Sequence, residues 1–194
     1  SHSDSCFSSS SSRRGFGGAI RTSSQTTIVN STLVGNEAGF VGGAVAGAAT
    51  VTNSLIASNT GGNPWDIQQN CTVELSNGGG NIQYPQRTTG NGNDYECFGG
   101  QTAVNPQLGA LSDNGGPTLT IPLLAGSPAI GGGLNAACPA TDQRGFPRAD
   151  GQCDVGAYEA GAAPGPILHR LRPPWAGVNE ATGPFTLTVY GAEL

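Results

Sequence analysis

The chain has 194 residues and a formal net charge of −5, and charged residues make up only 11% of it, against roughly 25% in an average soluble protein. All eight basic residues are arginine and none forms a long basic run, which excludes a general nucleic-acid-binding role because such a role needs many cations to neutralise phosphates. No apolar run approaches the roughly 20 residues that span a membrane as a helix.

Two stretches of the chain repeat one another. Residues 27–36 (TIVNSTLVGN) recur as residues 50–59 (TVTNSLIASN), and residues 17–20 (GGAI) recur as residues 42–45 (GGAV). A period in the low twenties that is rich in Val, Ile, Thr, Asn and Gly is typical of a coiled sheet, in which each period forms one turn and successive turns lie about 4.8 Å apart. The repeat therefore predicts an all-β fold, a parallel β-helix or solenoid.

Equivalent positions of the repeat predict which side chains stack. Two pairs are aliphatic and would form a buried column, and two pairs are asparagine and would form amide ladders at the bends: Ile28 with Val51, Leu33 with Ile56, Asn30 with Asn53, and Asn36 with Asn59. The alternative is a β-sandwich with accidental similarity. It is less favoured, because sandwich strands do not repeat residue identities in phase.

The predicted turns extend over residues 1–105, with a further turn through residues 78–82 (GGGNI). Residues 4–8 (DSCFS) look like a degenerate copy of residues 30–34 (NSTLV). We therefore expect an N-terminus made by processing, or a chain that is part of a longer protein.

The five cysteines favour disulfide bonds over a metal site. Cys71 and Cys97 flank one Gly/Asn-rich loop, Cys138 and Cys153 flank a Pro/Gly-rich loop, and Cys6 is left over. The chain has no CxxC pair and only two histidines, which disfavours zinc. Two disulfides predict an oxidising, extracellular setting, and each would stabilise the fold by roughly 3 kcal/mol.

Residues 106–160 carry a series of motifs: LSDNGGPT at 111–118, GSPAI at 126–130, DQRG at 142–145 and CDVGAYE at 153–159. This series resembles the tail of bacterial surface proteins of the choice-of-anchor or CSLREA type, and the resemblance covers about residues 15–159. It implies an exported, surface-attached, right-handed parallel β-helix with an irregular closing module. It supplies no agreed catalytic residues. The family usually has an aspartate soon after SPAI, where this chain has Gly131-Gly132-Gly133.

A small-residue linker, residues 161–165, leads to residues 166–194. This last segment resembles the opening strands of an immunoglobulin-like domain of the IPT/TIG type. Phe185, Leu187 and Val189 alternate with polar or amphipathic residues, as in a half-buried strand. A complete sandwich needs roughly 100 residues, so these strands must pair with sequence outside the chain or with another chain.

The acidic and arginine residues of the closing module have two interpretations. They could form ion-paired forks that hold an irregular segment in place, or a carboxylate pair or arginine base for polysaccharide cleavage. We favour the structural interpretation, because an active site on a β-helix would draw its residues from several successive turns. The acidic and arginine residues of the module all fall in one segment, and the predicted turns offer only Glu37, Asp66 and Glu74. The residues are Asp142, Arg144, Arg148, Asp150, Asp154 and Glu159.

Two weaker candidates concern ligands. Oxygen-bearing side chains at Asn91, Asn93, Asp94 and Glu96, or at Asp113 and Asn114, could bind calcium, or they could simply stabilise turns. Five aromatic residues could stack on sugars or cover junctions between loops and core: Trp65, Tyr84, Tyr95, Phe98 and Trp175. No other cofactor is indicated.

Together these features predict a non-enzymatic, secreted structural protein that acts by self-assembly or adhesion. Its partners would be copies of itself or components of a cell surface. The alternative is a polysaccharide lyase, a glycosidase or a carbohydrate-binding module on the same scaffold, with polysaccharide as its partner.

Overall fold

The computed structural model describes residues 15–63, 69–87 and 95–164. Over these residues the protein is all-β: it has ten short strands, no α-helix, and one 3-10 turn at Asn135–Ala137. The described residues include no helix long and apolar enough to cross a membrane. Cys6 and the predicted strand with Phe185, Leu187 and Val189 lie outside the described residues.

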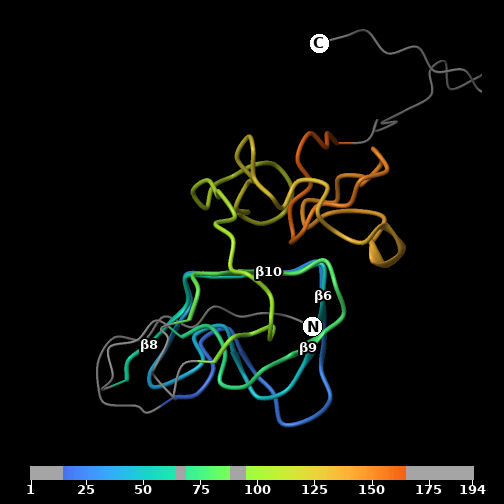
Figure 1. Ribbon diagram of the computed structural model, residues 1–194. Coiled ribbons are helices and arrows are strands. Elements are labelled where there is room, and N and C mark those ends of the chain that lie inside the picture. Colours follow the sequence, from blue (N-terminus) through green and yellow to red (C-terminus); the bar gives the residue numbers. More distant parts are fainter. Residues whose placement is uncertain (1–14, 64–68, 88–94, 165–194) are drawn as a thin grey trace, which may run out of the picture.

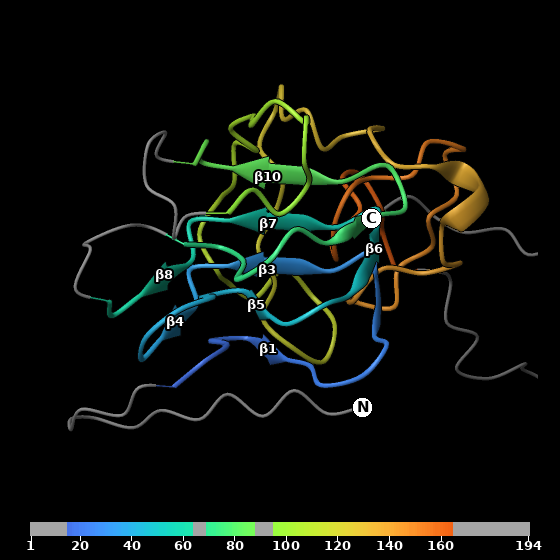
Figure 2. The same ribbon diagram turned by 60° about the horizontal axis from the view of Figure 1, so that its bottom comes forward.

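The ten strands form four parallel sheets, and two successive stretches of chain pass through all four in the same order (Figures 1 and 2). Strand order is β1-β5, β2-β6-β9, β3-β7-β10 and β4-β8. The strands are β1 Ile20–Arg21, β2 Thr27–Val29, β3 Thr32–Val34, β4 Glu37–Ala38, β5 Val45–Ala46, β6 Thr50–Thr52, β7 Leu55–Ala57, β8 Thr60–Gly61, β9 Ser76–Asn77 and β10 Ile82–Tyr84.

The register predicted from the repeat is confirmed. Ile28 of β2 pairs with Val51 of β6, and Leu33 of β3 pairs with Ile56 of β7. These side chains belong to one apolar core on which the sheets β1-β5, β2-β6-β9 and β3-β7-β10 converge. Val51 and Ile56 are fully buried. Stacked aliphatic side chains therefore hold successive strands together, because a single pass of the chain cannot bury its own apolar face.

The asparagine ladders are also present at the bends. Asn36 Nδ2 donates to Asn59 Oδ1 (2.8 Å), and Asn59 Nδ2 donates to Asn70 Oδ1 (2.9 Å). In the second ladder Asn53 Nδ2 donates to Asn30 Oδ1 (3.3 Å). Asn30 and Asn53 adopt φ angles of 42° and 50°, a left-handed conformation that asparagine tolerates better than most residues.

Residues 95–104 cover the end of the stack beside β9 and β10. The fully buried ring of Phe98 packs on the apolar core, next to the Cys71–Cys97 disulfide. The Gln83 side chain on β10 accepts a bond from Phe98 N (3.0 Å) and donates to Gln101 O (2.8 Å). Since the backbone oxygen of Gln83 also accepts from Val104 N (3.1 Å), both the side chain and the backbone of this residue join β10 to residues 98–104.

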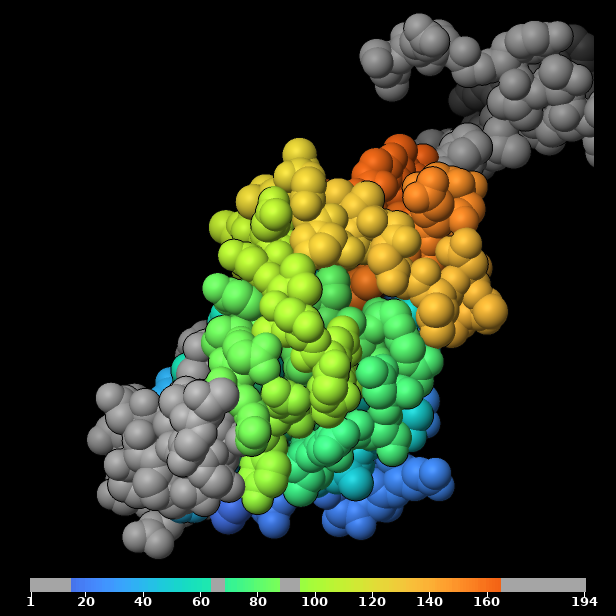
Figure 3. Space-filling view, in the orientation of Figure 1, coloured from blue at the N-terminus to red at the C-terminus, as the bar shows by residue number. Residues whose placement is uncertain are grey.

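Residues 106–160 pack against the outward face of the sheet β3-β7-β10 (Figures 1 and 3). Leu55 and Ala57 of β7 point to this second apolar cluster, whereas Ile56 between them points into the first core. Ala129 and Val155 complete the contact. The segment predicted as a closing module therefore flanks the strands, and the end of the stack is covered by residues 95–104 instead.

Candidate functional site

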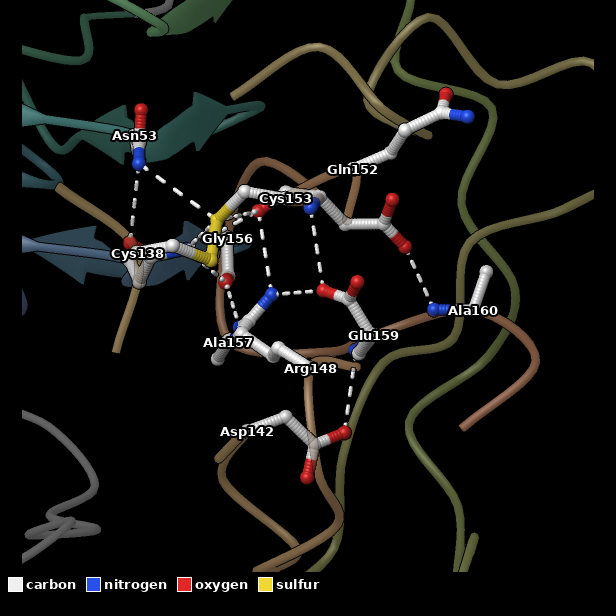
Figure 4. A network of polar contacts seen from close by, with 12 residues as sticks. Asn53, Cys138, Asp142, Arg148, Gln152, Cys153, Gly156, Ala157, Glu159 and Ala160 are labelled. Atoms are coloured by element: carbon white, nitrogen blue, oxygen red, sulfur yellow. Dashed lines mark hydrogen bonds and ion pairs between the residues drawn. A yellow bond between two sulfur atoms is a disulfide. The ribbon is translucent and has the colours of Figure 1, made fainter. Parts of the chain in front are cut away.

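Five of the six acidic and arginine residues singled out in the sequence meet in one buried network, and Figure 4 labels three of them, Asp142, Arg148 and Glu159. The five are Asp142, Arg144, Arg148, Asp154 and Glu159. Asp150 is exposed, and its Oδ1 accepts a bond from Gln152 N (2.9 Å) within its own turn. The network comes from three short stretches that residues 142–160 fold together.

Asp142 and Arg144 form the first half of the network. Asp142 Oδ2 accepts from Arg144 Nε (2.8 Å), and its other oxygen accepts from the backbone N–H groups of Arg144 and Phe146. The Arg144 guanidinium lies between the rings of Phe146 (4.4 Å) and Tyr158 (3.8 Å). Its planar, weakly hydrated cation suits this stacked and buried setting.

Arg148 and Glu159 form the second half. The pair is in direct contact and almost fully buried. Arg148 Nη2 also donates to Gly156 O (2.7 Å), and Glu159 Oε2 also accepts from Asp154 N (3.1 Å). Arg148 Nε and Glu159 Oε1 are buried without a hydrogen-bond partner, so this half is less completely satisfied than the first.

The pKa values of the two carboxyl groups are shifted in opposite directions, although burial raises both. Burial raises the pKa of Asp142, but the hydrogen bond from Arg144 and the backbone N–H groups of Glu159 and Phe146 together bring the pKa below 3.8. Burial raises the pKa of Glu159 above 4.5. The nearby charge of Asp154 adds to this, and the Arg148 cation and the Asp154 N–H only partly offset it.

Asp154 links the network to the Gly131–Gly133 loop. Its Oδ1 accepts from Gly131 N (2.7 Å) and its Oδ2 accepts from Ala160 N (2.6 Å). The Gly131–Gly133 loop is therefore held by an aspartate from the far end of the module, so the bend there does not depend on an aspartate of its own.

The network is joined to the strands through the bend asparagines. Asn30 Nδ2 donates to Asp154 O (3.1 Å), and Asn53 Oδ1 accepts from Leu134 N (2.7 Å). Gly156 N donates to the backbone oxygen of Asn53 (2.8 Å). The Cys138–Cys153 disulfide lies beside these contacts (Figure 4). The second asparagine ladder thus anchors the flanking segment as well as linking strands.

This arrangement suits a structural role. Glycoside cleavage needs two carboxyl groups that face the scissile bond. The side chains of Asp142 and Glu159 are 0% and 2% exposed. Arg144 and Arg148 are equally buried. The groups therefore bond to one another and to backbone, and they do not present an acid, a base or a cation to a substrate.

Where the structure describes them, the calcium candidates bond to other groups of the protein. Glu96 accepts from Gln86 Nε2 (2.7 Å) and lies 3.7 Å from Arg87 Nε. Asp113 accepts from Gly115 N (3.0 Å), and Asn114 donates to Thr120. Over the described residues no cluster of three or more His, Cys, Asp or Glu side chains could hold a metal ion. Asn91, Asn93 and Asp94 lie outside those residues.

The aromatic candidates do not form one platform. Phe98 is fully buried and Tyr84 packs against the second apolar cluster, whereas Tyr95 is 46% exposed. Trp65, Trp175 and Asp66 lie outside the described residues. Glu74, one of the acidic residues of the predicted turns, accepts a hydrogen bond from Gly99 N (3.1 Å). Of the aromatic set, Tyr95 is therefore the described residue most open to a ligand.

Sequence reasoning missed the aromatic partners of Arg144 and the amides that complete the ladders. Phe146 and Tyr158 follow the motifs DQRG and CDVGA, and an arginine two residues before a phenylalanine was a usable signal. Asn70 extends the first ladder but falls outside the repeat.

Comparisons with protein-family models, with curated proteins and with solved structures found no match to this chain.

Proposed function

We propose that this chain is a non-enzymatic extracellular structural protein built on a right-handed parallel β-helix of the choice-of-anchor or CSLREA type. The observation that carries the proposal is that the charged groups of the closing module bond to one another. The acidic and arginine side chains that could have formed an active site instead join residues 142–160 together. The in-register strands and amide ladders support a stiff, repeating scaffold.

Secretion is part of the proposal and rests on the disulfides. The described residues contain two, Cys71–Cys97 and Cys138–Cys153, the same pairs that the cysteine spacing predicted. Disulfides persist in oxidising compartments such as the extracellular space. The protein would accordingly act at or beyond a cell surface, on copies of itself or on surface components.

Self-assembly would proceed by strand donation. The alternating segment with Phe185, Leu187 and Val189 would add to an exposed sheet edge of a neighbouring copy, where main-chain bonds give affinity and alternate side chains give specificity. In the described residues, β1, β2, β3 and β4 are the edge strands of their sheets at the end of the stack away from residues 95–104. The low charge of the chain leaves few charged side chains to oppose such pairing.

Deletion of residues 166–194 tests this function, with assembly followed by sedimentation velocity and negative-stain electron microscopy. The deletion and the single change Leu187→Asp should both abolish assembly, whereas the matched change Thr188→Ser on the other side of the same segment should leave it intact. Unchanged assembly in the deletion variant would refute strand donation.

A polysaccharide-active enzyme on the same scaffold is the second candidate, and one observation favours it: an exposed aromatic residue, Tyr95, lies beside a surface depression. Depolymerisation assays on acidic polysaccharides would distinguish it from the structural role. Activity that is lost in Asp66→Ala or Glu74→Ala would replace the structural proposal with this one.

A further inference from the structure

One depression in the described surface lies on the outward side of the sheet β1-β5, away from the buried charged network. Its volume is about 430 Å³, within the range of roughly 300–1,000 Å³ that is typical of small-ligand sites. β1 and β5, which carry part of its lining, are parallel neighbours (Figure 2). Its lining includes Phe16, Arg21, Thr22, Ala46, Thr72 and Tyr95.

The depression exists because the middle strand carries the smallest side chains. Arg21 of β1 is in register with Ala46 of β5, and Thr72 follows Cys71, which bridges to Val45. Ala46 and Gly47 therefore form a low floor between larger residues on either side. A side chain at Gly47 would lie 2.3 Å from the backbone oxygen of Thr22, so the sequence can hardly fill this floor at that position.

An arginine with free donors borders the site. The guanidinium carbon of Arg21 lies 5.8 Å from the ring centre of Phe16, and among the described residues Arg21 forms no ion pair. Stacking on a ring positions a guanidinium without using its N–H groups. Arg21 is also exposed, so those donors remain available to a carboxylate, which arginine binds with two parallel bonds.

Two exposed rings complete the site. Phe16 is 45% exposed and Tyr95 is 46% exposed, and Thr22 and Thr72 also belong to the lining. Exposed aromatic faces beside threonine side chains suit a ligand with one apolar face and many hydroxyls. A pyranose ring has this character, and a carboxylate on the ring would meet Arg21.

We propose that this depression binds a saccharide that carries a carboxylate, with Arg21 as its anion-binding residue and Phe16 and Tyr95 as its stacking surfaces. A sugar fits better than an added peptide strand, because Arg21 and Ala46 lie side by side across the paired strands β1 and β5, so the depression lies on the face of this sheet and not along its edge. This inference does not rest on self-assembly. It assigns a ligand class to a surface that the structural role leaves unused.

Titration calorimetry with matched probes tests the proposal on the full chain. The probes are trigalacturonate, trimannuronate and triguluronate, each compared with its methyl ester, which keeps the ring and removes the charge. At least one acid should bind about tenfold or more tightly than its ester, the factor expected from losing a charge-assisted bond. Added salt should weaken binding of the acid and leave that of the ester unchanged.

Two kinds of variant separate the parts of the site. Arg21→Gln should bring the affinity for the acid down to that for the ester, and the matched control Arg87→Gln, an arginine outside the lining, should change nothing. Ala46→Met, which fills the floor, should weaken acid and ester alike. Tyr95→Ser should do the same, while the thermal midpoint of each variant reports that it has folded.

Several results would overturn the proposal. They are no binding of any of the three acids, equal affinity for acid and ester, or no effect of Arg21→Gln. Tighter, Arg21-dependent binding of an acetylated Asp-Glu dipeptide would assign the depression to peptide carboxylates instead. Failure of any of these tests would leave the assembly proposal untouched, because residues 166–194 take no part in them.

Discussion

The carboxyl groups of Asp142 and Glu159 lie in one buried network, yet they depend on pH in opposite directions. The pKa of Asp142 is below 3.8 in the folded chain, so its contribution to stability is present above 3.8 and is lost as the pH falls through the folded pKa. The pKa of Glu159 is above 4.5, so its contribution is present below 4.5 and is lost as the pH rises through the folded pKa.

Side-chain carbon NMR provides the direct check at the residue scale. We expect the Asp142 carboxyl carbon to titrate with a midpoint below 3.8 and the Glu159 carboxyl carbon with a midpoint above 4.5. Glu159 has one carboxylate oxygen buried without a partner, which adds to the cost of ionising it. A Glu159 midpoint at or below 4.5 would mean that Arg148 outweighs burial, contrary to this account.

Asp142→Asn should lower the free energy of unfolding by about 3–5 kcal/mol at pH 7, because it leaves the buried Arg144 cation without its counter-charge. Chemical denaturation measures the change. Asp150→Asn is the matched control: it is an exposed aspartate in the same segment, and its replacement should cost less than about 0.5 kcal/mol. Equal losses in the two variants would show that the network does not hold this segment.

At the scale of elements, the first asparagine ladder links three passes of the chain through Asn59. Its side chain bonds Asn36 and Asn70 and also donates to the backbone oxygen of Leu33 (2.9 Å). Each buried group left without a partner costs about 1–3 kcal/mol. A ladder residue should therefore matter more than an asparagine that stabilises a single exposed turn.

Asn59→Ala should accordingly destabilise the fold by about 2–3 kcal/mol, whereas Asn105→Ala, which removes one exposed turn bond, should cost well under half of that. Urea denaturation followed by circular dichroism would measure both. A loss at Asn59 no larger than that at Asn105 would contradict the view that the ladder holds adjacent strands together.

The two disulfides hold different parts of the fold. Cys71–Cys97 holds the residues that cover the end of the stack, and Cys138–Cys153 closes a loop of the flanking segment. Replacing either pair by serine should lower the free energy of unfolding by roughly 3 kcal/mol, since the entropy of loop closure depends only logarithmically on the sequence separations of 26 and 15 residues. Only the Cys138–Cys153 replacement should leave the burial of Phe98 unchanged, which amide hydrogen exchange at residues 95–104 would report.

What the sequence predicted well follows from local repetition. Ile28 with Val51 and Asn36 with Asn59 could be paired because both members are the same kind of residue, one period apart. The later strands were harder to place in register: β6 pairs with β9 and β7 with β10 after an insertion that changes the period. Their partners, such as Thr50 with Ser76, share no obvious identity.

The position of residues 106–160 could not be predicted, because it depends on contacts far apart in the chain. Motifs indicated that the segment is distinct and carries ion pairs, and these pairs are present. That it lies on β3-β7-β10 depends on Leu55 and Ala57 facing outward and on Asn30 and Asn53 bonding to it. Asn30 and Asn53 bond both to each other across adjacent strands and to residues 106–160. Nothing in a single sequence distinguishes such asparagines from those that only stabilise a bend.

At the scale of the whole molecule, the described residues form a stack whose two ends differ. One end is covered by residues 95–104, and at the other β1 to β4 are edge strands. A scaffold with one covered end and one set of edges would assemble in a single direction, since a donated strand has only one kind of edge to join. Polar filaments or ordered layers are therefore the expected products, and closed symmetric dimers are not.

Electron microscopy of native, unconcentrated material tests the central claim of self-assembly most directly. The account predicts ordered filaments or layers with a regular repeat, and their loss when residues 166–194 are removed. Isolated short rods that remain single at every concentration would contradict it. That result would leave adhesion or saccharide binding, rather than self-assembly, as the role of this scaffold.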